Sequence, residues 1–413
     1  MKAPFYRIFI DNDSKRELTE YVDGFKYEDC TEEDDMIEFR ISPENAKVFD
    51  EDKELITGVN LTFEFGYMGL ETSGFRKARI TDVSVKYADF ISITVRALDK
   101  GTVMKKQSSC KVWKDKTTKD IVSEIAQMYG LTPYCEIEGT RWKSLPQGHL
   151  SDYEFLQQVA MKEADGDYIC FVRDTELRFE KRGVEKKSKR TFTYGDPESK
   201  ILSFEPKNQE STAKKGGINS TAAGFDAMNK KPVVHSSSRK DGAMLDEYVN
   251  VYDANGNKTG TKKVPIQQPE KQQKDATLGT QGLGQTMVMP PMDGKSLGST
   301  AKSQTKAGAL NQETASLRIE GDPTIRANEV ITMAGVFKKH SGNWYAKKVT
   351  HEINSGGYIT TYELAKNGRK VGSVKATGKV NKTVGSSKSE PNKTTIPVQK
   401  QSVNKYNANA EKV

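Results

Sequence analysis

The chain has 413 residues, enough for two or three domains, and 35% of them are hydrophobic. The net charge is +8, but residues 366–413 hold eleven Lys or Arg and only two acids. The rest of the chain is therefore close to neutral, and only this end favours an acidic partner such as nucleic acid. No run of about 18 apolar residues occurs, which excludes a membrane-spanning helix, and the four cysteines are too far apart for a CxxC metal or redox motif.

Residues 1–104 are expected to form a β domain. Five segments alternate apolar and other residues as half-buried strands do: 5–10, 36–41, 61–65, 77–86 and 90–98. The short Tyr87-Ala88-Asp89 predicts a hairpin between the last two. Strands at this spacing, with almost no helical periodicity, favour a barrel or a sandwich.

Residues 105–180 are expected to form a small α+β domain. One helix is predicted to start at 117–120 and to end at Gly130. A second is predicted from Ser151 and Glu154, whose spacing is that of a capping box. A hairpin is expected to follow, with strands at 168–172 and 176–180.

A second β domain is expected from residues 181–235 together with 306–366. Its predicted elements are strands at 190–194, 201–205, 219–225, 231–235, 316–320, 329–334, 344–353 and 358–364, and a short helical segment at 306–315. Residues 236–305, rich in Gly, Gln, Lys, Ser and Thr, are predicted to be a flexible insertion that contains a hairpin at 248–264. Residues 367–413 are predicted to be a basic, disordered tail.

No catalytic, cofactor-binding or metal-binding residues are predicted. The four histidines, at 149, 235, 340 and 351, have no metal-ligand spacing, and His351 is interpreted as structural because it shares a strand face with apolar residues. The glycines at 282–284 follow no strand, and 253–257 is interpreted as a hairpin turn, not a calcium loop. Two acidic segments, 28–35 and 50–54, could hold a cation or a glycosidase acid pair, but are interpreted as solvated loops.

Three blocks of the sequence carry a family resemblance. They are Gly66-Tyr67 with 79–83 and 91–99; 151–160 with 163–166 and 177–179; and 321–325 with 335–336, 342–345, 349–351 and 356–361. Together they resemble the late control protein D family, the hub proteins of contractile phage tail baseplates. Only the first block departs from the family pattern, with Lys77-Ala78-Arg79 where a glycine is frequent. The resemblance covers about residues 1–235 and 306–366.

The resemblance implies a mainly β fold with a small α+β insertion and two tail-tube-like barrels in each chain. It also implies a homotrimer whose six barrels form a ring that joins the six-fold tail tube to the three-fold spike. The expected partners are the spike protein, tail tube or tube-initiator proteins, other baseplate subunits and the tape-measure protein. The expected location is the virion tail baseplate, assembled in the cytoplasm of the host bacterium.

Other functions stay open at this point. A type VI spike protein would fuse a similar hub to a needle, but no periodic glycine-rich segment follows residue 366. A cell-wall binding or peptidoglycan-degrading tail module is the main alternative, since 111–135 resembles part of a glycan-binding unit. Nucleic-acid binding by the basic tail is a third, although Tyr406 is its only aromatic residue. The expected role is structural and not enzymatic.

Overall fold

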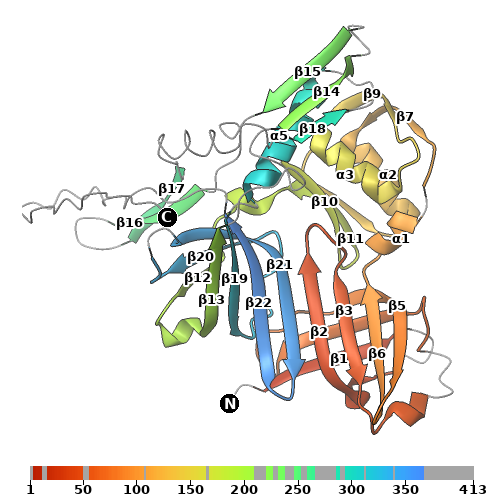
Figure 1. The fold of residues 1–413 in the computed structure, drawn as a ribbon, viewed down its shortest axis with the longest axis vertical. Coiled ribbons are helices and arrows are strands. Elements are labelled where there is room, and N and C mark those ends of the chain that lie inside the picture. The colour runs from red at the N-terminus through yellow and green to blue at the C-terminus, as the bar shows by residue number, and fades with distance from the viewer. Residues whose placement is uncertain are drawn as a thin grey trace, which may run out of the picture.

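The computed structural model shows a mainly β chain, as the sequence predicts. A 12-stranded sheet runs through two lobes, and an α+β unit lies above them (Figure 1). The residues that the structure describes are 3–11, 16–49, 55–106, 108–163, 167–208, 220–226, 231–237, 246–252, 258–265, 285–288, 294–310, 313–337 and 340–366.

The first lobe consists of six strands in the order β1-β4-β5-β6-β3-β2, each antiparallel to its neighbours. Its elements are β1 (Pro4–Ile10), η1 (Thr19–Tyr21), β2 (Val22–Cys30), β3 (Met36–Ile41), η2 (Ala46–Phe49), β4 (Asn60–Tyr67), β5 (Arg76–Tyr87) and β6 (Ile91–Leu98). The predicted β5–β6 hairpin is confirmed. The sequence did not indicate β2, because Gly24 and the acids at its end are rare in strands.

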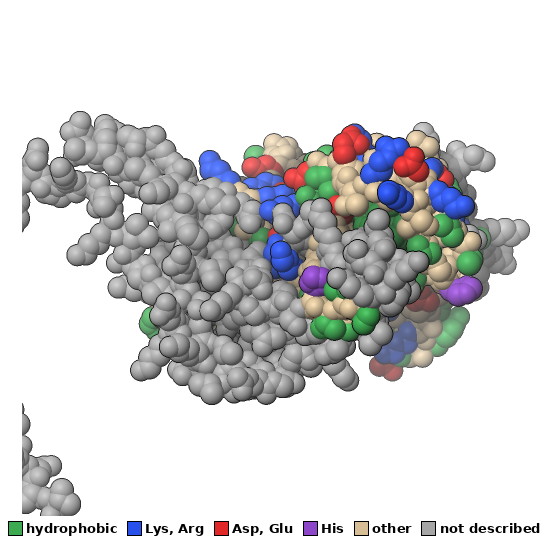
Figure 2. All heavy atoms as spheres, turned by 90° about the horizontal axis from the view of Figure 1, so that it is seen from above, with side chains coloured by type: hydrophobic (Ala, Val, Ile, Leu, Met, Phe, Trp, Pro, Cys, Tyr) green, Lys and Arg blue, Asp and Glu red, His purple; other side chains and the backbone are tan. Residues whose placement is uncertain are grey.

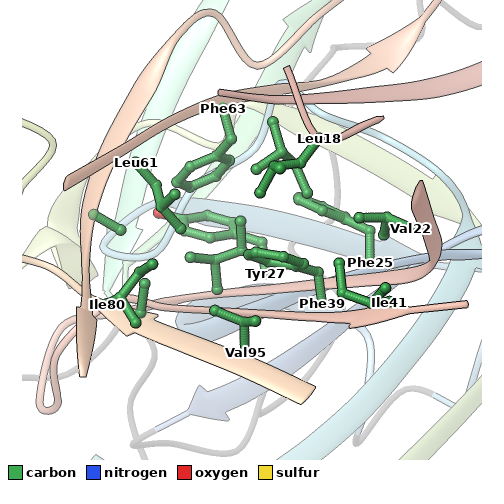
Figure 3. Packing of buried hydrophobic residues seen from close by; sticks show 14 of the residues in the cluster. Leu18, Val22, Phe25, Tyr27, Phe39, Ile41, Leu61, Phe63, Ile80 and Val95 are labelled. Atoms are coloured by element: carbon green, nitrogen blue, oxygen red, sulfur yellow. The ribbon is translucent and has the colours of Figure 1, made fainter. Parts of the chain in front are cut away.

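Alternate residues of these strands build the core of the first lobe. In β3, Ile37, Phe39 and Ile41 are buried while Arg40 points outward. Their packing partners come from all five remaining strands of the lobe and from the segment before η1 (Figure 3). Among them are Leu18, Val22, Phe25, Tyr27, Leu61, Phe63, Ile80 and Val95. A core that draws on all six strands fixes their register, since a slip of one residue would turn each apolar side chain outward.

The α+β unit has two short sheets and three helices. Its elements are α1 (Gly101–Lys106), β7 (Val112–Thr117), α2 (Thr118–Met128), β8 (Thr132–Cys135), β9 (Arg141–Pro146), α3 (Asp152–Lys162), β10 (Tyr168–Arg173) and β11 (Glu176–Lys181). Thr117 with Asp120, and Ser151 with Glu154, form capping boxes at α2 and α3. Gly130 has a left-handed φ of +61° after α2, which confirms the predicted end of that helix.

The second lobe consists of six strands in the order β12-β20-β21-β22-β19-β13. Its elements are η4 (Gly183–Glu185), β12 (Arg190–Thr193), η5 (Pro197–Ser199), β13 (Ile201–Asn208), β19 (Glu313–Glu320), β20 (Val330–Ala334), β21 (Gly342–Asn354) and β22 (Gly357–Lys366). Only β12 and β20 are parallel. A separate core, which includes Trp344 and Tyr362, fills this lobe.

The two lobes share one strand order, and they differ in that β1 is antiparallel to β4 whereas β12 is parallel to β20. Numbered along its own lobe, each has the strand order 1-4-5-6-3-2, so β2 corresponds to β13, β5 to β21 and β6 to β22. Bulges occur at corresponding places, after Ile80 in β5 and Ala346 in β21, and after Val22 in β2 and Ile201 in β13. Corresponding positions include Tyr87 and Ile353, Ile91 and Tyr358, and Phe25 and Phe204.

The remaining described elements lie outside the large sheet. They are β14 (Ser220–Asp226), β15 (Lys231–Ser237), β16 (Asp246–Tyr252), β17 (Lys258–Pro265), β18 (Gln285–Val288) and α5 (Gly294–Leu310). Both predicted hairpins, β14–β15 and β16–β17, are present. However, β14 pairs with β18 in a sheet of its own, and not with the second lobe.

Helix α5 differs from the sequence prediction. It begins at Gly294, within the segment predicted to be flexible, and ends at Leu310, so that 313–315 belongs to β19. Its small buried residues, such as Ser299 and Thr300, give only a weak apolar pattern. Packing against β14, β15 and α3 stabilises it instead. The boundaries of the five predicted domains stay predictions.

Candidate assembly interface

The two lobes are joined by direct strand pairing. On one edge, β21 pairs first with β20 and then, through Lys348–Ile353, with Phe25–Cys30 of β2. Its other edge pairs with β22. Within this ladder Lys26 lies opposite Glu352, and such opposite charges favour the register. The large sheet is therefore continuous from one lobe to the other.

The residues on either side of the turn between β21 and β22 pack into the first lobe, while Asn354, Ser355 and Gly356 of the turn itself are exposed. Ile353 and Tyr358 are 4% and 5% exposed, and both belong to the core of the first lobe. The ring of Tyr358 lies 5.4 Å from that of Tyr67 and 6.2 Å from that of Phe65. A Cβ on Gly321 would lie 2.0 Å from the Tyr358 ring, so only glycine leaves room for it. Ile353 and Tyr358 thus form a plug that the second lobe contributes to the first.

Buried His351 lies beside this plug. Its Nδ1 is 2.9 Å from the hydroxyl of Tyr358 and 3.3 Å from Oγ1 of Thr360, and its ring lies 4.7 Å from that of Phe65. Burial, and then the positive charge of Arg76, lower the pKa of His351 well below its usual value. A neutral imidazole among aromatic rings favours the structural role predicted from the sequence over a role as a ligand or base.

Arg326, in the loop before β20, connects all three parts of the chain. Its Nε lies 2.7 Å from Oδ2 of Asp29 in the first lobe, and its Nη1 lies 2.7 Å from Oδ2 of Asp174 in the β10–β11 turn. The buried Arg76 also approaches Asp29, at 3.7 Å. Burial alone would raise the pKa of Asp29, but the charges of Arg326 and Arg173 outweigh it and lower this pKa to about 2. The carboxylate is therefore charged and paired inside the junction.

The acidic segment 28–35 is only in part the solvated loop that the sequence predicts, since Glu32 and Glu33 are exposed but its two ends are not. It begins inside β2, and Asp29 and Asp35 are 1% and 6% exposed. The buried guanidinium groups explain the error, because a charge removed from water must be paired. The second acidic segment, 50–54, lies outside the described residues.

Asp35 is the second buried aspartate of this acidic segment. Its carboxylate accepts hydrogen bonds from the hydroxyl of Tyr27 at 2.6 Å and from the N–H of Cys30 at 2.9 Å, and its own N–H donates to Asp99 at 3.0 Å. Burial, and then the negative charge of Asp29, raise the pKa of Asp35 to about 7. Burial and the charge of Asp35 likewise raise the pKa of Asp99.

The raised pKa of Asp35 predicts that the chain loses stability as the pH rises. Between the usual aspartate pKa near 4 and about 7, the folded chain keeps a proton that the unfolded chain releases, so the contribution is full below this window and lost above it. The loss for this group is expected to reach up to about 4 kcal/mol. Asp35→Asn should flatten the dependence in urea unfolding measured at about pH 5 and about pH 7.5. An equally steep dependence in the variant would contradict the prediction.

The turn between β5 and β6 carries an exposed apolar patch. Val85, Tyr87 and Phe90 are 45%, 78% and 64% exposed. Two aromatic residues beside a predicted turn are the only sequence signal for this patch, and no sequence pattern points to Arg326. Exposed apolar clusters of this kind mark surfaces for other proteins.

An apolar pocket opens in the second lobe, between β12 and β13. It has a volume of about 620 Å³ and is lined by Tyr194, Phe204, Pro206, Gly335, Val336, Phe337 and His340. Phe337 is 79% exposed, and Phe204 packs edge-on against Trp344 at 5.7 Å. Since β12 and β13 are the two ends of this lobe's sheet, the pocket lies between its two edges. We call it the second-lobe pocket.

The described residues hold little that suggests chemistry. Among them, no three His, Cys, Asp or Glu side chains lie close enough together to hold a metal ion. All four cysteines are free. None of the described helices has the length and hydropathy of a membrane span. The segments 253–257 and 282–284, considered above as a turn and a glycine loop, lie outside the described residues.

Charge on the upper face is mixed. Seen from above the α+β unit, Lys and Arg side chains alternate with Asp and Glu over the coloured residues (Figure 2). A nucleic-acid backbone favours a continuous basic patch. The part of this face that is drawn in colour does not present one.

The family described as the Alg8 N-terminal domain matches residues 38–355, a range that begins in β3 and ends in the plug. The chain belongs to this family. The Alg8 N-terminal domain match thus includes the α+β unit and most of both lobes; it does not confirm membership of the late control protein D family. No curated protein sequence matches the chain.

Two solved structures share the fold of this Alg8 N-terminal domain chain. The 43 kDa tail protein of prophage MuSo2 from Shewanella oneidensis matches with a TM-score of 0.59 and 10% identity, over 88% of this chain and 99% of that chain. A tail protein from Neisseria meningitidis MC58 matches with a TM-score of 0.59 and 10% identity, over 88% and 97%. At such low identity the two matches show a shared fold over almost the whole of each tail protein.

Proposed function

We propose that the chain is a structural hub in the baseplate of a contractile phage tail or a related injection particle. The observation that carries the proposal is the duplicated six-stranded lobe, joined edge to edge in a fold shared with two phage tail proteins. The proposed role is structural and not catalytic. The resemblance to late control protein D hubs, which was found independently in three blocks of the sequence, supports the same role.

The duplicated lobe suits an adaptor between two symmetries. A homotrimer of two-lobed chains would place six similar lobes in one ring, which could meet a six-fold tail tube on one side and a three-fold spike on the other. The proposed partners are therefore the spike, the tube or tube-initiator proteins, other baseplate subunits and the tape-measure protein. The proposed location is the virion tail baseplate, after assembly in the cytoplasm of the host.

The mass of the purified chain in solution tests the proposal. Light scattering after size-exclusion chromatography should give about three times the 46.0 kDa of one chain. A monomer at all concentrations would contradict the homotrimer. A cleared zone on a peptidoglycan gel would instead favour the cell-wall-degrading alternative.

A further inference from the structure

We infer that the β5–β6 turn of one copy plugs the second-lobe pocket of the next copy, while β13 of that next copy pairs with the free half of β5. The contact repeats, between chains, the junction that joins the two lobes inside each chain. It rests on the proposed self-association and assigns the surfaces that make it. The occupant of the pocket is thus a second copy of this chain.

The first step is that corresponding strands are paired in one lobe and free in the other. In the second lobe, one edge of β21 has two partners. Its first half pairs with β20, and its later half pairs with β2 of the first lobe. In the first lobe, β5 pairs with β4 through Arg76–Arg79, and Ile80 bonds to Gly58 and Val59 just before β4, so among the described residues 81–87 have no backbone partner on that edge. Likewise, β13, which corresponds to β2, has one described partner, β19. Within the part of the chain that the structure describes, one donor edge and one acceptor edge therefore have no partner strand.

The second step is that the socket is filled in one lobe and open in the other. In the first lobe, Tyr358 of the plug packs on Phe65 and Tyr67. The pairing patterns align β4 with β20. When this alignment is extended past the end of β20, Phe65 corresponds to Gly335 and Tyr67 corresponds to Phe337. Both line the second-lobe pocket of about 620 Å³.

The third step is that the matching turn carries two exposed aromatic side chains, although Ile91, the counterpart of Tyr358, is partly buried against its own lobe. Tyr87 corresponds to Ile353, yet Tyr87 is 78% exposed and Ile353 is 4% exposed. Phe90, beside it, is 64% exposed. Burying both aromatic side chains in an apolar pocket would remove the largest apolar surface on this turn from water.

The fourth step is the register that the correspondence dictates. The pairing of Phe25 with Ile353 becomes Phe204 opposite Tyr87 of the other copy, and Glu205 then lies opposite Lys86. Opposite charges face each other there, as Lys26 and Glu352 do within the chain. Pro206 cannot donate a hydrogen bond, so the ladder has one donor fewer than its counterpart; proline on an edge strand also discourages pairing with unrelated chains.

The fifth step is the direction of growth. In Figure 1, β12 and β13 lie on the left of the lobes and β5 on the right, so one chain cannot pair its own two surfaces. Two different patches at opposite ends make a heterologous contact, which repeats head to tail and closes into a ring where the rotation allows.

Cysteine cross-linking tests the register. In this register Ser84 lies opposite Lys207, both exposed, at the distance that a disulfide spans. The double variant Ser84→Cys with Lys207→Cys, in a background with the exposed Cys110 replaced by Ser, should form covalent oligomers on mild oxidation. The matched control is Lys86→Cys with Lys207→Cys, two residues out of register. It should cross-link at least about tenfold less.

The outcomes separate the inference from the proposed function. Register-specific cross-links that end at a covalent trimer support both the contact and the proposed hub. Register-specific cross-links from a chain that is monomeric by light scattering support the contact but not the stable homotrimer. A trimer without this cross-link, or with the control cross-linked equally well, overturns the contact and leaves the hub proposal standing. Neither trimer nor cross-link overturns both.

A second variant does not depend on disulfide geometry. Tyr87→Ser should lower the oligomer fraction about tenfold or more, since an aromatic side chain leaves the pocket. Because Tyr87 is exposed in the single chain, the unfolding midpoint of the monomer should not change. Unchanged oligomerisation would overturn the inference.

Discussion

Arg326→Met is expected to lower the free energy of unfolding by about 3–5 kcal/mol, because it leaves a buried carboxylate without its closest partner. Arg326 lies 2.7 Å from Asp29, which is 1% exposed, and 2.7 Å from Asp174. Arg76, at 3.7 Å from Asp29, remains but is the more distant cation. Urea unfolding of the purified variant measures the effect.

A surface ion pair provides the matched control. Arg96 lies 2.5 Å from Glu38, but its side chain is 54% exposed, so Arg96→Met should destabilise the chain far less than Arg326→Met. Adding Asp29→Asn to Arg326→Met should recover part of the loss, because the unpaired charge is gone. A loss in Arg326→Met no larger than that in Arg96→Met would show that the junction network does not stabilise the fold.

The same network fixes how stability responds to acid. The pKa of Asp29 is lowered to about 2, so its contribution is full above the usual aspartate pKa near 4 and is lost as the pH falls through about 2. Asp35 responds in the opposite sense, since its pKa is raised. One junction thus holds two aspartates whose contributions disappear at opposite ends of the acidic range.

Local structure followed from the sequence where short-range chemistry decides it. The Ser151 and Glu154 spacing predicted the start of α3, and Gly130 predicted the end of α2, because caps depend on residues a few positions apart. The β5–β6 and β10–β11 hairpins followed from alternating patterns on either side of short turns. Helix α5 did not, since tertiary packing and not its own apolar stripe holds it.

The junction could not be predicted, because its members are far apart in the chain. Nothing in the sequence links Asp29, Asp174 and Arg326, and a pattern of acids looks the same whether it faces water or a buried arginine. The residues alone show no internal repeat either, and two barrels were expected only from the family resemblance. Corresponding positions carry different side chains, as with Phe65 and Gly335, and only the shared strand order and the matching bulges reveal the duplication.

Tyr358→Ala is expected to lower the free energy of unfolding by about 3–5 kcal/mol and to loosen the contact between the lobes. The side chain fills the space above Gly321 and packs on Phe65 and Tyr67, so its removal leaves a cavity inside the first-lobe core. Tyr358→Phe keeps the ring and removes only the hydroxyl that contacts His351, and should cost about 1 kcal/mol.

The rate of thiol labelling at Cys30 reports on this junction in particular. Cys30 is buried on β2 opposite Lys348, and burial raises its pKa to about 11, so it should react slowly in the intact chain. In Tyr358→Ala, opening of the β2–β21 ladder should accelerate its labelling, whereas Cys170, buried in the α+β unit, should react as slowly as before. Equal acceleration at both thiols would indicate global destabilisation. Acceleration at neither would mean that the plug does not hold the lobes together, and would also weaken the case that its exposed counterpart at Tyr87 joins one chain to the next.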